Sequence, residues 1–215
     1  NMSFDILVKY MDNITWYLNA CVRISGSTTV YFDPYGITSD APRADIVLTT
    51  HPHLDNYSLD NINQIMDNDS TLLLTHDSDA LNKHGHVIPV KPHQNIKIED
   101  ILIKTVPAYS LENNYHPKEN NWIGYIVEMD GLRYYHAGDT ELIPEMGELG
   151  EIDVAFLPVG GIYTMDVSEA LEAVKIIRPK VAMPIHFGMI AGTYDDADEF
   201  VSSCPAASRI LKVTR

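Results

Sequence analysis

The chain has 215 residues, 45% hydrophobic and 21% charged, a balance typical of a globular protein with a sizeable buried core. Its formal net charge of −15 would repel nucleic-acid phosphates and anionic membranes, so we expect a small-molecule substrate and neither nucleic acid nor membrane as partner. No apolar run could span a bilayer, residues 1–10 show no signal-peptide pattern, and Cys21 and Cys204 make no disulfide framework; we expect a cytoplasmic protein with both thiols buried.

The first half of the chain is rich in short β-branched and aromatic runs. These runs predict strands at residues 13–19, 21–25, 28–34, 44–50, 70–76, 87–92, 95–100 and 101–108. Gly26-Ser27 predicts a hairpin between the second and third of them, and the almost continuously apolar run at 44–50 is typical of a strand buried on both faces. Helices are expected at 58–66, with Ser58 as N-cap, and at 77–85.

The second half alternates strands with helices. A long hairpin is predicted over residues 122–140, turning at Asp130-Gly131. Helices at 166–179, with Asp166 and Glu169 spaced as a capping box, and at 195–203 then separate strands at 152–160, 180–188 and 208–214. No repeat or linker interrupts residues 1–215, so the pattern predicts a single domain of packed sheets with helices outside, an α+β or α/β sandwich.

Metal-binding residue types occur at the ends of three apolar strands. His51 and His53 in "THPHLDN" are two residues apart, so both rings project to the same side of an extended backbone, and Asp55 continues that parity. Asp139 follows a glycine at the end of "YYHAGDT", and His186 ends the strand "MPIHFG". Because metal sites need several rigidly held donors that converge from separate strands, these five residues are the candidate ligands.

In its ordered motifs the chain resembles the metallo-β-lactamase superfamily, in particular its small cytoplasmic hydrolases related to ascorbate-phosphate lactonase. The matching segments include "YFDPYGI", "ADIVLTTHPHLDN", "YYHAGDTE", "DVAFLPVGGIYTMDVSEA" and "PKVAMPIHFG". The resemblance implies a four-layer αβ/βα sandwich with a site at one edge of its two sheets. It further implies that His51 and His53 bind a first metal, that Asp55 and His186 bind a second, and that Asp139 bridges the two.

The chain departs from the family pattern at three places. The motif H-x-H-x-D-H ends here in Asn56, and Asn19 replaces a histidine of the opening strand. Asn56 could instead cap the next helix or form an Asx turn. The third histidine of the first metal site has no match, because "VPAYS" places Tyr109 and Ser110 there; His116 nearby could supply the imidazole, contact the substrate, or be a plain surface-loop residue.

Other candidate residues have structural interpretations. Regular alternation turns His136 away from Asp139, which favours a hydrogen-bonded structural role. Four further histidines in polar turns are expected to be solvated: His76, His84, His86 and His93. Three aromatic residues could line a substrate pocket or belong to the core: Tyr109, Trp122 and Tyr163.

The function indicated is metal-dependent hydrolysis with one or two divalent ions, zinc first and manganese or iron as alternatives. A metal-activated water would attack a carbonyl or phosphoryl centre, Asp55 or Asp139 would orient it and take its proton, and His116 could protonate the leaving group or hold an anion. Two carboxylates leave a dinuclear centre net positive, which suits a small anionic ester, lactone or phosphodiester. The competing hypothesis is a degenerate member with one metal or none that binds a small molecule without turnover.

Overall fold

Two mixed β-sheets form the centre of the computed structural model, which describes residues 9–78 and 86–211. The first sheet has six strands in the order β1-β2-β3-β4-β5-β6, namely Ile14–Trp16, Val22–Ser25, Thr29–Phe32, Ile46–Leu48, Thr71–Thr75 and His86–Val90. The second has seven in the order β13-β12-β11-β10-β9-β8-β7, namely, from β7 to β13, Asn95–Ile98, Ile101–Pro107, Ile123–Met129, Leu132–His136, Val154–Pro158, Val181–Ile185 and Ala207–Ser208.

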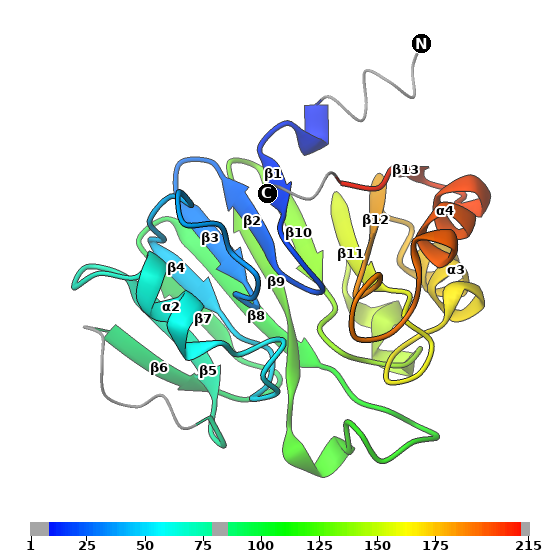
Figure 1. The fold of residues 1–215 in the computed structure, drawn as a ribbon, viewed down its shortest axis with the longest axis horizontal. Coiled ribbons are helices and arrows are strands. Elements are labelled where there is room, and N and C mark those ends of the chain that lie inside the picture. The colour runs from blue at the N-terminus through cyan, green and yellow to red at the C-terminus, as the bar shows by residue number, and fades with distance from the viewer. Residues whose placement is uncertain (1–8, 79–85, 212–215) are drawn as a thin grey trace.

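Helices cover the outer faces of the two sheets, as in the four-layer sandwich expected from the sequence. Figure 1 shows α2 (Leu59–Ile65) on one side and α3 (Val167–Ile177) and α4 (Tyr194–Ser203) on the other, with the sheets between them. Alternation along β4 explains this arrangement: Val47 packs with α2, while Ile46 and Leu48 belong to the core shared with the second sheet.

The helices begin where their capping residues predict. Asp166 accepts a hydrogen bond from the Glu169 backbone N–H, and the Glu169 side chain accepts one from the Asp166 N–H, so the expected capping box is confirmed. Thr193 and Asp196 form a second capping box at α4. The expected Ser58 cap of α2 is confirmed as well, and the helix predicted at 77–85 lies mostly outside the described residues.

Both predicted hairpins form, β2–β3 at Gly26-Ser27 and β9–β10 at Asp130-Gly131, whereas the first and last strands differ from the prediction in their bounds. Asp130 and Gly131 both have positive φ, 54° and 76°, and connect β9 to β10 as predicted. The first strand stops at Trp16, earlier than expected, because the chain turns through Asn19 at φ 51°. The strand predicted at 208–214 was wrong over its described part, since β13 covers Ala207–Ser208 and residues 209–211 are not in a strand; residues 212–214 lie outside the described residues.

The carboxyl ends of the parallel strands meet at one edge of the sandwich. Strands β3, β4, β5 and β6 are parallel, as are β10, β11, β12 and β13 in the other sheet. In Figure 1 the loops that follow β4, β8, β11 and β12 gather at the lower end of the molecule. The candidate ligands all belong to these loops or to the segment after β10, and ligands in open α/β sheets bind at such an edge.

Two smaller predictions concern single residue types. Cys21 is fully buried, and burial raises the pKa of its thiol to about 12, as expected of an inert apolar side chain; Cys204 is only partly buried, which corrects the expectation for that residue. Within the described parts of the chain, no helix is long and apolar enough to cross a membrane.

Candidate metal centre

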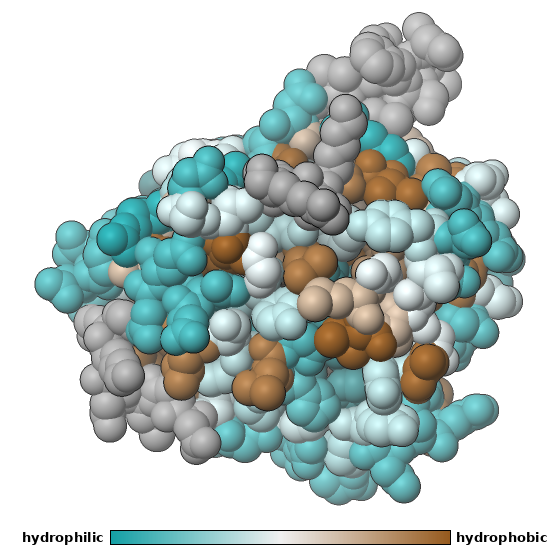
Figure 2. Space-filling model, in the orientation of Figure 1, coloured by the Kyte–Doolittle hydropathy of each residue, from teal (hydrophilic) through white to brown (hydrophobic). Residues whose placement is uncertain are grey.

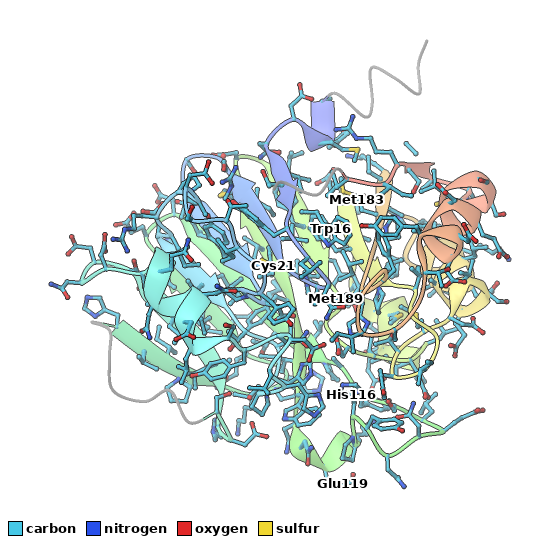
Figure 3. The ribbon with its side chains drawn as sticks, in the orientation of Figure 1. Trp16, Cys21, His116, Glu119, Met183 and Met189 are labelled. Carbon is cyan, nitrogen blue, oxygen red and sulfur yellow. The ribbon has the colours of Figure 1, made fainter. Side chains whose placement is uncertain are left out.

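Six side chains form two groups of three possible metal ligands. His51, His53 and His116 make the first group, and Asp55, Asp139 and His186 the second; within each group the donor atoms lie within 4.8 Å of one another. They come from the loop after β4, the long β8–β9 connection, and the segments after β10 and β12. Figure 3 shows His116 at the lower end of the molecule, with Glu119 further out on the same connection.

Asp139 lies between the two groups. Its Oδ2 is 3.1 Å from His186 Nε2, 3.5 Å from His116 Nε2 and 3.7 Å from His51 Nε2. The preceding glycine permits this position: Gly138 has φ 67°, and a Cβ there would lie 2.8 Å from the Ile123 carbonyl oxygen. One carboxylate oxygen thus faces both groups, as a bridging ligand must.

A hydrogen-bonded chain sets the orientation of the His51 ring. His51 Nδ1 lies 2.9 Å from Thr50 Oγ1, and that hydroxyl donates to Asp33 Oδ2 at 2.9 Å. Because the Thr50 hydroxyl hydrogen is used in the bond to Asp33, the Thr50 oxygen accepts from His51 Nδ1–H. His51 Nε2 then keeps its lone pair for a metal. His51 Nε2 also lies 2.9 Å from His53 Nδ1, close to the roughly 3.3 Å between two nitrogens on one tetrahedral zinc.

His116 is oriented in the same way. Its Nδ1 lies 3.0 Å from the Tyr163 carbonyl oxygen and therefore carries the proton, while its buried Nε2 has no hydrogen-bond partner among the described residues. That nitrogen lies 3.5 Å from Asp139 Oδ2, and the centroid of the His116 ring lies 5.0 and 5.2 Å from the centroids of the His51 and His53 rings. A buried lone pair without a donor is costly, and a cation at this point would remove the cost.

Burial and neighbouring charges shift the pKa values of His51 and His186 in opposite directions. Burial lowers the pKa of His51 to about 3, so its ring is neutral at physiological pH, as a ligand must be. For His186 burial also opposes the charged form, but the Asp139 carboxylate outweighs it and raises the pKa of His186 to about 10. Burial would raise the pKa of Asp139, yet His186 and His51 hold it well below its usual range. A cation bound here would displace the His186 proton.

The two asparagines that replace family histidines donate to the carboxylates. Asn19 Nδ2 bonds Asp55 Oδ2 at 2.8 Å, and Asn56 Nδ2 bonds Asp139 Oδ1 at 3.2 Å and Asp33 Oδ2 at 3.1 Å. Because carboxylates accept only, the amide nitrogen must face them. The alternatives of helix cap and Asx turn do not describe Asn56, since Ser58 caps α2 and the Asn56 side chain lies inside the site.

Aromatic residues form the walls of the site. Trp122 is buried, and the centroid of its ring lies 4.9, 5.0 and 5.6 Å from the ring centroids of His51, His53 and His116. A cavity of about 150 Å³ opens beside the ligands. It is lined by His53, Asp55, Tyr115, His116, Asp139, Tyr163, His186 and Ile190.

These observations agree with a divalent metal. Three imidazoles form one donor set, and two carboxylates with one imidazole form the other, both of which are common in metal sites. Two further features also favour a metal: His116 Nε2 has no partner among the described residues, and the bond from His51 Nδ1 to Thr50 leaves the lone pair of His51 Nε2 available. His186 has φ 56°, and a non-glycine residue in this region is a form of strain that occurs at functional sites.

The structure brings together all six residues that the sequence singled out for the site: His51, His53, Asp55, His116, Asp139 and His186. His136 lies apart with its Nε2 2.8 Å from the Ala20 carbonyl oxygen, which confirms its structural role. His76, His86 and His93 are exposed as expected, and His84 lies outside the described residues. Of the three aromatic candidates, Tyr163 lines the cavity, Trp122 packs on the imidazoles, and the Tyr109 hydroxyl bonds Glu145.

Sequence reasoning missed Asp33, Thr50 and the cavity residues Tyr115 and Ile190. The position of Asp33, directly after a buried strand, was an available signal because His186 directly follows the buried strand β12 in the same way. No sequence pattern marks Thr50 or Ile190, because Thr50 also needs the distant Asp33 as its acceptor and Ile190 lines a cavity formed by several loops.

Comparison with known proteins agrees with this geometry. A family model described as a beta-lactamase superfamily domain matches residues 13–186. A UPF0173 metal-dependent hydrolase of Methanosphaerula palustris is 31% identical over 204 residues, covering 87% of this chain and 88% of that one. A UPF0173 protein of Pyrococcus furiosus is 34% identical over 194 residues and 86% of each chain. The crystal structure of a candidate metal-dependent hydrolase from Parabacteroides distasonis superposes with a TM-score of 0.82 at 33% identity, covering 94% of this chain and 93% of that one. The chain therefore belongs to the metallo-β-lactamase superfamily.

Proposed function

We propose that the protein is a metal-dependent hydrolase whose centre holds two divalent ions. The observation that carries this proposal is the pair of donor groups that share Asp139 between them. His51, His53 and His116 would hold one ion, and Asp55 and His186 the other. The name metal-dependent hydrolase carried by UPF0173 relatives supports the same activity.

The donor sets favour different metals. Three neutral imidazoles suit zinc, whereas two carboxylates and one imidazole form a harder set that also suits manganese or iron. We propose zinc in the three-histidine set, and zinc, manganese or iron in the other. His116 acts in this proposal as a ligand, because its Nδ1 is committed to the Tyr163 carbonyl and only Nε2 faces the centre.

The residues of the site then have separate roles. Bound ions would supply Lewis acidity to a substrate oxygen and a water of lowered pKa. An ionised carboxylate accepts hydrogen bonds and can accept a proton, so Asp55 or Asp139 would orient the attacking water and take its proton. Asp33, through Thr50, keeps the His51 ring in the tautomer that leaves Nε2 free. Trp122 covers the imidazoles and excludes solvent from that side.

Charge favours a reacting group that becomes negative. Two divalent ions against the two carboxylates Asp55 and Asp139 leave the centre net positive, which stabilises the charge that develops on a carbonyl or phosphoryl oxygen. We therefore propose an ester, a lactone or a phosphodiester as the bond that is broken.

Metal analysis of protein purified without chelators is the first test, and hydrolysis of aryl esters, lactones and bis-aryl phosphodiesters is the second. The proposal expects two transition-metal ions per chain, and turnover that a chelator removes and added metal restores. Clearly substoichiometric metal would overturn it. Bound metal with no turnover on any of these substrates would instead favour the competing function, a metal-poor family member that binds a small molecule.

A further inference from the structure

Large apolar side chains are concentrated around the metal centre. Of the nine exposed large hydrophobic residues in the described parts of the chain, six lie on the four loops that surround the ligands. We call them the apolar collar: Leu54, Leu111, Tyr115, Ile162, Met189 and Ile190. Figure 2 shows apolar side chains in the lower middle of the viewed face, and Figure 3 labels Met189 on that face above His116. Scattered exposed apolar residues need no explanation, but a cluster beside a site marks a binding surface.

Two residues of the collar also line the cavity at the metal centre. Ile190 and Tyr115 line the same cavity as five of the proposed ligands, and Tyr163 completes its wall. The rings of Tyr115 and Tyr163 meet edge to face with centroids 4.6 Å apart, so they form a joint wall. A cavity of about 150 Å³ has the size of one that binds benzene. Bound ions and the reacting group would take up much of this volume, so the rest of a substrate would extend over the collar.

Cations to hold a second negative group are scarce on these loops. Residues 52–58, 108–122, 159–166 and 187–193 contain a single Lys or Arg, which is Lys118. Its ammonium lies 3.2 Å from Glu145 Oε1 and 3.0 Å from the Tyr109 hydroxyl, so it is already paired. Away from the ions, a phosphate or carboxylate on the substrate would meet apolar side chains in a protein with net charge −15.

We propose that the substrate carries an uncharged apolar group that binds against the apolar collar, next to the bond that is hydrolysed. This inference rests on the proposed function, because it names the substrate class of the same centre. It selects esters and lactones with an alkyl or aryl body, and phosphodiesters with such a body, over sugar phosphates and nucleotides. The collar determines which substrates bind, and the metal centre performs the reaction.

Binding of non-hydrolysable analogues tests the collar separately from turnover. The metal-loaded full chain is titrated calorimetrically with methyl-, propyl- and pentylphosphonate, and with a phosphonate of pentyl length that ends in a carboxylate. We expect each added methylene to lower the dissociation constant by about twofold to fourfold. The carboxylate-ended compound should bind more weakly than pentylphosphonate, and the heat-capacity change should become more negative with chain length.

Ile190→Lys removes the apolar wall and adds a cation, so it should abolish the dependence on chain length and improve binding of the carboxylate-ended compound. Ile176→Lys is the matched control, since Ile176 is 41% exposed on α3 and Ile190 is 44% exposed in the collar. If Ile190→Lys does not fold, Ile162→Lys replaces it. Sedimentation of both variants and the parent reports the oligomeric state.

Three results would overturn the inference: affinity independent of chain length in the parent, equal binding of the carboxylate-ended compound, or a parent dimer that Ile190→Lys dissociates with the length dependence unchanged. The last would make the collar an interface between copies. Hydrolysis of p-nitrophenyl acetate, butyrate and hexanoate separates the two proposals. Turnover without a length effect in binding would refute only the collar, and a length effect in binding without turnover of any ester or phosphodiester would refute only the hydrolase.

Discussion

Replacing Thr50 by valine removes one oxygen from the metal centre while it keeps the shape of the side chain. The Thr50 backbone N–H still donates to Asp33 Oδ1 at 2.8 Å, so the main chain stays anchored. What is lost is the link from Asp33 through Oγ1 to His51 Nδ1, which leaves that buried ring nitrogen without its partner. Losing such an orienting contact costs about 10- to 100-fold in metal affinity, or about 1.4–2.8 kcal/mol.

The assay is competition for zinc against a chelator of known affinity, with thermal unfolding of the same samples. Thr49→Val is the matched control, because its buried hydroxyl donates to the Leu73 carbonyl at 3.2 Å and does not contact a candidate ligand. We expect it to lose about 1 kcal/mol of stability and to keep its metal affinity. If Thr50→Val keeps the zinc affinity of the parent, or if both variants lose zinc affinity equally, the hydrogen bonds from Asp33 through Thr50 do not set the His51 tautomer.

Three further substitutions test other parts of the centre, and a fourth tests the connection beside it. His51→Ala should abolish bound metal and hydrolysis and leave the far-ultraviolet circular dichroism unchanged, because the sheets do not depend on the ion; loss of the fold with metal retained would make His51 a core residue. Asp139→Asn should lower occupancy of both ions in metal analysis, since it removes the shared charge, and parental occupancy would refute the bridge. Asn56→Ala should weaken binding of both ions by about tenfold in the chelator competition, because Asp139 loses the hydrogen bond that holds it in position. Glu141→Ala should increase proteolysis of the β8–β9 connection, because the Glu141 carboxylate accepts from Leu111 N and Glu112 N; an unchanged cleavage rate would contradict that role.

Local patterns were sufficient for most of the fold. The strand at β4 is an apolar run bounded by polar residues, and the β9–β10 turn has an Asp-Gly pair, so both could be predicted without knowledge of their neighbours. The short β13 could not, because it forms only two residue pairs with β12, Val181–Ala207 and Ala182–Ser208. The length of β13 is set by its tertiary contacts, so a prediction from apolar residues alone overestimates the length of such an edge strand.

The ligands could be predicted for a similar reason, and their surroundings could not. His51, His53, Asp139 and His186 each follow an apolar strand within a few residues, so the sheet edge alone brings them together. His116 is different, since it is located on a long connection and is placed by its bond to the Tyr163 carbonyl. No periodicity reports such a contact.

The two asparagines show why the departures from the family motif are compatible with a working metal centre. As substitutes for imidazole ligands they would be poor, because an amide oxygen binds a borderline metal weakly. In the structure their nitrogens instead hold Asp55 and Asp139, and Oδ1 of each asparagine has no hydrogen-bond partner among the described residues. Leaving two buried acceptors unpaired costs about 1–3 kcal/mol each, a cost that stability alone does not explain. The cost is reasonable if fixed carboxylates are needed to hold a cation. Asn19 and Asn56 therefore favour the hydrolase over a protein that has lost its metals, because they position the acidic ligands that such a protein would not require.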